Sequence, residues 1–209
     1  NAVSNSVMDT ITVSVLDTHD NVVTGSTASI AGTLSSNAFS AGTATKSASS
    51  GVGTFDDLQV ATAATGYTIV FTSAGLTSAT SSAFSMVAGA ASKLAISAQP
   101  STTVAGSAAS ASLSVTDANN NPALYSGLIT ATLTANSLGA VLGGTSSVTI
   151  TASSSAAFSN LLLVKAGSGY TVSFSAPGLA VVQSSAFAIT PAAASKLSVS
   201  DQPVNGVSN

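Results

Sequence analysis

The chain has 209 residues but no cysteine, tryptophan, arginine or glutamate, and only 5% of its residues are charged. Without cysteine it can form neither a disulfide nor a thiolate zinc site, and it has no cysteine nucleophile. An average soluble domain is about 25% charged. The four basic residues are scattered lysines, too few to neutralise a phosphate backbone. We therefore expect no nucleic-acid partner.

Long hydrophobic runs are also missing, although 45% of the residues are hydrophobic and the mean hydropathy is +0.51. The longest dense run of large apolar residues, 161–164, has four residues. A membrane-spanning helix needs about 20, so we expect no membrane insertion. High hydropathy with little charge also argues against intrinsic disorder. The chain is therefore predicted to fold.

The sequence contains two copies of one unit. Residues 66–71 (GYTIVF) recur as 169–174 (GYTVSF), and residues 81–84 (SSAF) recur unchanged at 184–187. Residues 91–94 (ASKL) recur at 194–197, so all three pairs share an offset of 103 residues. An internal repeat of this kind takes precedence over other assignments of the fold.

Each copy has the pattern of β-strands. Apolar residues alternate with polar ones in segments such as 11–15 and 67–71, which is the period of half-buried strands. Strand-like runs recur with no helical period between them, which predicts a sandwich of about seven strands per 100 residues. Tyr67 and Tyr170 each follow a glycine and open a late strand, as a tyrosine corner does. With Phe71 and Phe174, they are predicted to be equivalent core residues.

The ordered motifs resemble a known family. Gly-Tyr-Thr, Ser-Ser-Ala-Phe and the joint Ala-Ser-Lys-Leu follow an early Asp-x-x-x-Asn turn at 17–21 and again at 117–121. In this order they resemble bacterial immunoglobulin-like tandem repeats, relatives of the invasin and intimin stalk domains of large secreted and surface proteins. The resemblance covers nearly the whole chain. It implies an all-β fold of two tandem immunoglobulin-like β-sandwich domains and an extracellular, secreted or cell-surface location.

The two copies are out of phase with the ends of the sequence. We expect repeat 1 at 1–90, lacking its opening strand, and repeat 2 at 91–192. Residues 193–209 are then the opening strand of a following repeat or a donor strand for the next copy. This assembly strand is predicted from Lys196, Leu197, Val199, Gln202 and Pro203. After it, 205–209 (NGVSN) repeats the pattern of 1–5 (NAVSN).

Asp-rich turns are the candidate metal site. Calcium prefers six to eight oxygen ligands, and the two early turns offer Asp17, Asp20, Asp117 and Asn119. Asp and Asn also occur in turns for conformational reasons alone, and this is our main interpretation. The single histidine, His19, lies in the first of these turns, where the second copy has Asn. We interpret it as a turn-surface residue and not as a catalytic base.

Other candidates for chemistry are weaker. Asp56 and Asp57 are adjacent and would point to opposite faces of a strand, so we interpret them as loop or strand-end residues. An isopeptide bond to asparagine is conceivable for the four lysines only if a buried lysine, an asparagine and a catalytic acid come together; these are Lys46, Lys93, Lys165 and Lys196. We therefore predict no enzyme and no cofactor, with calcium as the one possible exception.

The expected function is a structural fibre or stalk whose partners are other copies of the chain, joined head to tail into a filament or surface appendage. The alternative is an adhesin-type module that binds carbohydrate or a cell surface through loop tips, with Tyr125 as the main aromatic candidate. The many Ser and Thr residues are compatible with O-glycosylation.

Overall fold

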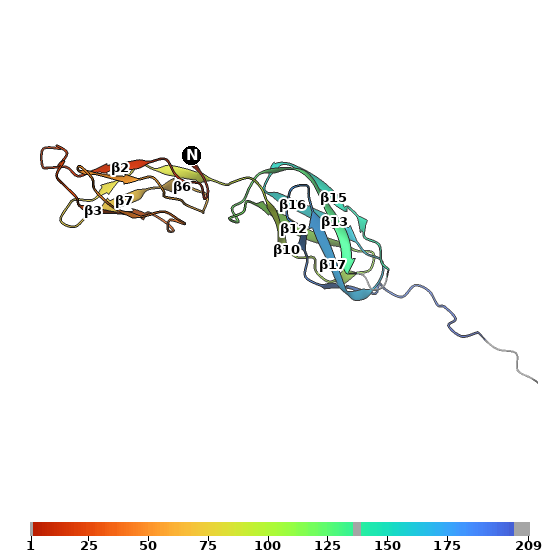
Figure 1. Cartoon of the computed structure of the whole chain (residues 1–209). Coiled ribbons are helices and arrows are strands. Elements are labelled where there is room, and N and C mark those ends of the chain that lie inside the picture. The colour runs from red at the N-terminus through yellow and green to blue at the C-terminus, as the bar shows by residue number, and fades with distance from the viewer. Residues whose placement is uncertain (1, 136–138, 203–209) are drawn as a thin grey trace, which may run out of the picture.

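The computed structural model describes residues 2–135 and 139–202, and over these residues the regular secondary structure consists of strands, with no helix. The all-β prediction is confirmed. Figure 1 shows two elongated β bodies that lie end to end. We call them unit one, which contains β1–β9, and unit two, which contains β10–β19.

Unit one has nine short strands arranged in three hydrogen-bonded groups. The groups are β2-β5, β1-β9-β6 and β4-β3-β7-β8. The strands are β1 (Ala2–Val3), β2 (Ile11–Ser14), β3 (Ser29–Leu34), β4 (Thr45–Ser47), β5 (Val52–Phe55), β6 (Ala64–Tyr67), β7 (Ile69–Thr72), β8 (Ala79–Thr80) and β9 (Phe84–Val87).

Unit two has longer strands in two main sheets. One sheet has the order β10-β12-β16-β14, and the other β11-β19-β17-β13-β15, with β18 beside β17. Two largely antiparallel sheets connected in this way form an immunoglobulin-like sandwich. The strands are β10 (Lys93–Ala98), β11 (Thr103–Val104), β12 (Ala108–Thr116), β13 (Tyr125–Ala135), β14 (Gly143–Gly144), β15 (Ser147–Ser153), β16 (Ser155–Leu162), β17 (Gly167–Ser175), β18 (Val182–Gln183) and β19 (Phe187–Thr190).

Each unit has its own hydrophobic core. The cluster of unit one draws on residues between 2 and 86, and the cluster of unit two on residues between 91 and 189. Equivalent aromatic pairs lie at the same place in both. The ring centroids of Phe55 and Phe71 are 5.1 Å apart, and those of Phe158 and Phe174 are also 5.1 Å apart. This tilted geometry is favourable for aromatic rings.

Both predicted tyrosine corners are present. The Tyr67 hydroxyl donates to the Thr62 carbonyl (3.1 Å), and the Tyr170 hydroxyl donates to the Lys165 carbonyl (3.0 Å). Each tyrosine is 1% exposed. The hydroxyl bonds a backbone group, so the buried phenol satisfies its polar end while the ring fills the core.

Strand pairing repeats with the same register. Gly32 opposes Phe71 in β3 and β7, as Ala131 opposes Phe174 in β13 and β17. Even the two-residue strand β14 has a counterpart in the bridge between Ala41 and Gln59. In the described part of unit one, however, no strand corresponds to β10. The two units therefore differ at the sheet edge that β10 occupies in unit two.

Candidate functional site

Strand β10 follows unit one in the sequence but completes unit two. It pairs antiparallel with β12, with Leu94 opposite Val115 and Ile96 opposite Leu113. Ser92, which directly precedes β10, is hydrogen-bonded to the other sheet near β18, because the Ala180 amide donates to the Ser92 carbonyl (2.9 Å). Leu94 is only 5% exposed. The strand therefore closes the gap between the two sheets and buries its apolar face there.

The equivalent place in unit one is an open groove. A cavity of about 680 Å³ lies between β2 with its following turn and the hairpin that joins β7 to β8. Leu76, on this hairpin, is 44% exposed, whereas its counterpart Leu179 in unit two is 8% exposed. Val13 is half-buried, whereas its counterpart Leu113 is buried. Among the residues that the structure describes, β2 pairs with β5 alone, so its other edge leaves unpaired backbone beside apolar side chains.

The segment that repeats β10 lies elsewhere and is exposed. Residues 193–202 form no strand, and Figure 1 shows this segment leaving unit two at the end away from unit one. Leu197 is fully exposed and Val199 is 68% exposed, although Leu94, the counterpart of Leu197, is buried. Of the predicted assembly residues, Lys196, Leu197, Val199 and Gln202 lie in this segment. Pro203 lies outside the described residues.

Apart from this groove and segment, a polar site joins the two units. The Asp117 Oδ2 atom accepts hydrogen bonds from the Ser4 hydroxyl (2.9 Å) and the Gly89 amide (2.8 Å) of unit one. The Asn121 Nδ2 group donates to the Ala61 carbonyl (2.8 Å), and the Ala63 amide donates to Asn121 Oδ1 (2.8 Å). Charged and neutral hydrogen bonds thus hold the turn between β12 and β13 of unit two against the adjoining end of unit one.

The turn that carries this site is built from its own sequence. The Asp117 Oδ1 atom accepts from the backbone amides of Asn119 (2.8 Å) and Asn121 (2.9 Å). Asn120 has φ 68°, a conformation that Asn tolerates better than most residues. Asp117 is 2% exposed and Asn121 6% exposed, so the two residues that contact unit one are buried, while Ala118 and Asn120 stay exposed.

The first copy of this turn has the same internal bonds but, within residues 2–135 and 139–202, no such contact with another unit. The Asp17 Oδ1 atom accepts from the amides of His19 (2.8 Å) and Asn21 (2.9 Å), and Asp20 has φ 63°. Asp17 and Asn21 are exposed. The loop after β2 lies at the end of unit one away from unit two (Figure 1). The turn therefore takes its shape without a neighbour.

Both aspartates are held in the charged form. Burial alone would raise the pKa of Asp117, but hydrogen bonds from Asn121, the Gly89 amide and Ser4 outweigh it and hold the pKa well below its usual range. The pKa of Asp17 is lowered chiefly by the backbone amide and side chain of Asn21. Negative charge is therefore available at both turns at neutral pH.

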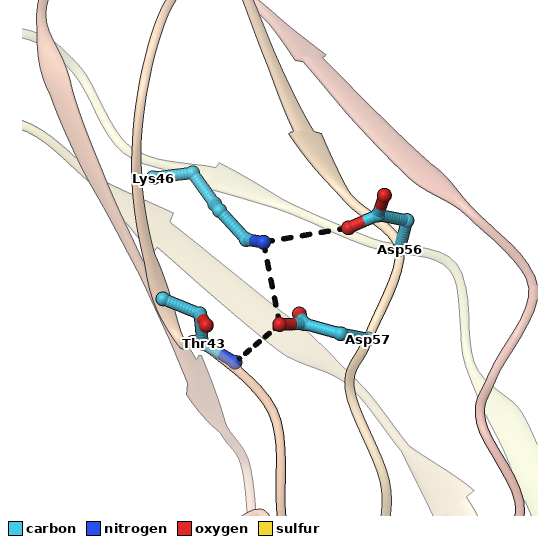
Figure 2. Close-up of polar contacts among 4 residues, drawn as sticks. All are labelled: Thr43, Lys46, Asp56 and Asp57. Carbon is cyan, nitrogen blue, oxygen red and sulfur yellow. Dashed lines mark hydrogen bonds and ion pairs between the residues drawn. The ribbon is translucent and has the colours of Figure 1, made fainter.

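Lys46 forms a surface cluster with two carboxylates (Figure 2). Its Nζ atom lies 3.3 Å from Asp56 Oδ1 and 3.3 Å from Asp57 Oδ2, and the Thr43 amide donates to Asp57 Oδ2 (3.1 Å). The two aspartates follow β5 outside any strand, as the loop interpretation expected. The opposite-face argument does not apply to them, because both carboxylates reach the same lysine.

The pKa values in this cluster shift as an ion pair requires. The pKa of Asp57 is lowered chiefly by the hydrogen bond from the Thr43 backbone. Burial would lower the pKa of Lys46, but contacts with Asp57 and Asp56 raise it. The Lys46 side chain is 26% exposed, and in the described part of the chain its polar contacts are these carboxylates. It therefore lacks the buried lysine and asparagine that an isopeptide bond needs.

The remaining candidates are dispersed. His19 is exposed, and its Nδ1 atom lies 3.2 Å from the Thr18 hydroxyl. Asp17 and Asp20 share the first turn, while Asp117 and Asn119 share the second. In the part of the chain that the structure describes, no three His, Cys, Asp or Glu side chains gather as a metal site would require. The expectation of no cofactor, with calcium as the one exception, stays a prediction.

Tyr125 is not a loop-tip aromatic. It begins β13, is half-buried against the core of unit two, and its hydroxyl donates to the Pro177 carbonyl (2.9 Å). The expectation of an exposed aromatic platform is therefore wrong for this residue, because its ring and hydroxyl both have partners within unit two.

The joint between the units has no counterpart among the sequence-based predictions. The sequence assigns Asp117 and Asn121 to turn chemistry and does not connect them with Ser4 or Gly89. A usable signal is present, since Asp and Asn recur at the same turn positions in both copies. The partners on unit one are mainly backbone groups, which carry no side-chain signature.

Comparisons with known proteins give only distant matches. No family model matches the sequence, and no curated protein matches it. Among solved structures, the chain is similar to the D00-D0 domain of intimin, with a TM-score of 0.45 and 12% identity over 89% of this chain and 86% of that chain. It is also similar to the Escherichia coli adhesin FdeC, with a TM-score of 0.41 and 23% identity over 93% of this chain and 61% of that chain.

A further similar structure is a family 2 glycosyl hydrolase from Bacteroides cellulosilyticus, with a TM-score of 0.39 and 13% identity over 78% of this chain but only 21% of that chain. The similar structures thus include intimin domains, an adhesin and a glycosyl hydrolase. Within the described residues, no helix has the length and apolar character needed to cross a membrane.

Proposed function

We propose that the chain is a structural component of an extracellular stalk, fibre or surface appendage. In this proposal its immunoglobulin-like units join end to end, and each is completed by the opening strand that follows the preceding unit. One observation carries the proposal. β10 fills the groove of unit two, while the equivalent groove of unit one is open and the equivalent segment, 193–202, is exposed.

The occupant of the open groove is the segment 193–202 of a second copy. Its sequence repeats that of β10, with Leu197 in place of Leu94 and Val199 in place of Ile96. Apolar residues at alternate positions give this segment one face that favours burial. The free edge of β2 offers backbone hydrogen-bonding groups to an added strand.

The contact joins two different surfaces, the tail of one copy and the groove of the next. Such a heterologous contact does not close on itself unless its rotation does, and otherwise it extends into a filament. Repeated units that contact chiefly their neighbours provide length without a new fold. A mechanical or spacing role, without catalysis, follows from this arrangement.

Sedimentation velocity of the full chain at rising concentration tests the proposal. We expect end-to-end species that grow with concentration, and we expect Leu197→Asp to abolish them because a charge would enter the groove. Ser198→Asp is the matched control. Its counterpart Ala95 is exposed on the outer face of β10, so the same charge one residue along should leave association nearly unchanged.

Two outcomes would refute the proposal. One is a full chain that stays monomeric at the highest concentration reached. The other is association that continues unchanged when residues 193–209 are deleted. A segment folded back onto its own unit one is the specific rival, and it predicts a monomer whose groove becomes exposed only after that deletion.

A further inference from the structure

We infer that the exposed turn 17–21 is a docking site for the far end of unit two in a second copy. It would form the same joint that Asp117 and Asn121 form within the chain. This inference deepens the proposed head-to-tail assembly and rests on it, but it concerns a different contact. The strand fills a groove, whereas the turn fixes how one unit sits on the next.

The two turns match in their internal bonding. Asp17 and Asn21 make the same intra-turn bonds as Asp117 and Asn121, including the bond from the Asn side-chain amide to the Asp Oδ2 atom (3.1 Å and 2.9 Å). In the second turn Oδ2 also accepts bonds from unit one. In the first turn Asp17 as a whole residue is exposed. It is preorganised for the same donors, so little ordering would be needed for docking.

The receiving surface also repeats, because the end of unit two has the bonding of the end of unit one. The Gly106 amide donates to the Leu163 carbonyl, as the Asn5 amide donates to the Val60 carbonyl in unit one. Likewise, the Ala105 amide donates to the Thr190 carbonyl, as the Ser4 amide donates to the Val87 carbonyl. By this register, the groups that bind Asn121 at Ala61 and Ala63 recur at Val164 and Ala166. The Gly89 amide recurs at Ala192. Val164, Ala166 and Ala192 are exposed.

The charges at the two joints differ. Within the chain, Lys93 Nζ donates to the Ala118 carbonyl (3.0 Å) and to Asn120 Oδ1 (2.8 Å). In the joint between copies the pair that corresponds to Lys93 and Asn120 is Lys196 and Asp20. A hydrogen bond from a charged lysine to a neutral amide thus becomes an ion pair, which adds complementarity and salt sensitivity. One hydrogen-bond donor is lost in exchange, because Ala105 occupies the position that Ser4 has in unit one.

The test uses two copies joined in one polypeptide, with residue 204 of the first followed by residue 1 of the second, so that residues 205–209 of the first copy are omitted. This spacing reproduces the internal joint, in which residue 101 precedes the counterpart of residue 1, and it raises the effective concentration of the contact. Amide hydrogen exchange is then measured residue by residue. Ala63 and Gly89 report the internal joint, and Ala166 and Ala192 of the first copy report the new one.

We expect exchange at Ala166 and Ala192 to be slowed by about tenfold or more relative to the single chain. Asp17→Ala in the second copy should remove this protection while the internal joint keeps its own. Thr18→Ala is the matched control in the same turn. Ala105→Ser in the first copy should restore the missing donor and increase the protection.

Equal exchange at Ala166 and Ala192 in the single chain and in the joined copies would overturn the inference. The Thr77 amide of the second copy separates this failure from failure of the proposed function, because its counterpart Ala180 bonds the residue that precedes the opening strand. Protection at Thr77 alone would support strand docking and refute the turn contact. Protection at Ala192 alone would support the turn contact and refute strand docking.

Discussion

Unit one and unit two have the same core and register but differ at their edges. Both bury a tyrosine corner and a tilted pair of phenylalanines. Unit two has the strand β10 at its sheet edge and a turn whose Asp117 and Asn121 are buried, while unit one has a groove at that edge and a turn whose Asp17 and Asn21 are exposed. In the described residues the matching core pairs are therefore found with and without these two features.

The low charge of the chain bears on the same comparison. Free sheet edges are usually protected by charged side chains, especially lysine, and here only 5% of residues are charged. In unit two the edge of β12 is covered by β10. In the proposed assembly, segment 193–202 of a second copy would cover the edge of β2 in the same way.

The largest expected effect concerns the shared core. Phe174→Ala should destabilise unit two by about 3–5 kcal/mol, and Phe71→Ala should destabilise unit one by a similar amount, because each change leaves a cavity beside a buried phenylalanine. Urea unfolding monitored separately in each unit measures both. The exposed Val181→Ala is the control. A cost of about a few tenths of a kcal/mol for either phenylalanine would contradict the assigned equivalence.

The next effect distinguishes the two copies of the opening strand. Leu94→Ala should cost about 2–5 kcal/mol, because Leu94 is buried in unit two. Leu197→Ala should leave the stability of the dilute chain unchanged, since Leu197 is exposed there. Thermal unfolding at low concentration compares them. Similar losses for both variants would mean that segment 193–202 is already docked in the single chain.

The joint between the units should be sensitive to acid. The pKa of Asp117 is lowered in the folded chain, so its contribution is present above the unfolded pKa of about 3.9 and is lost as the pH falls through the lower folded value. We expect Gly89 amide protection to fall in this range. Asp117→Asn should weaken the joint by about 1–3 kcal/mol at neutral pH. Protection that does not change with either treatment would show that Asp117 does not hold the joint.

Removing the tyrosine hydroxyls should have smaller effects. Tyr67→Phe and Tyr170→Phe each delete a hydrogen bond to a backbone carbonyl while keeping the buried ring, so each should cost about 0.5–1.5 kcal/mol. Tyr67→Phe should cost the more of the two, because the Tyr67 hydroxyl also accepts a hydrogen bond from Asn37 Nδ2 (3.1 Å). Urea unfolding of both variants gives the comparison. If only one unit lost stability, the hydroxyl of the other corner would not stabilise its unit as expected.

The smallest effect is expected at the cluster of Lys46. Surface ion pairs contribute little and are screened by salt. Lys46→Ala should shift the urea midpoint of unit one only slightly, and the difference should shrink further at high salt. A large shift that does not depend on salt would point to a packing role for the lysine stem.

Much of the fold can be predicted from the sequence because it repeats. Alternation around Tyr67 and Phe71, found again at Tyr170 and Phe174, is enough to identify strands and core positions. The joint cannot be predicted in this way, since Asp117 and Asn121 bind mainly backbone groups of unit one. Tyr125 is misassigned for a similar reason. A sequence does not reveal that a ring and hydroxyl near a strand end find partners at residue 177.

Adding a peptide of residues 191–203 to the isotopically labelled full chain, and recording amide shifts, tests most directly whether the groove of unit one takes up this segment. We predict saturable shifts along β2 and at Thr77, the rim of the open groove, and no such shifts with a peptide carrying Leu197→Asp. Unchanged groove signals at saturating peptide, or shifts confined to unit two, would contradict strand docking.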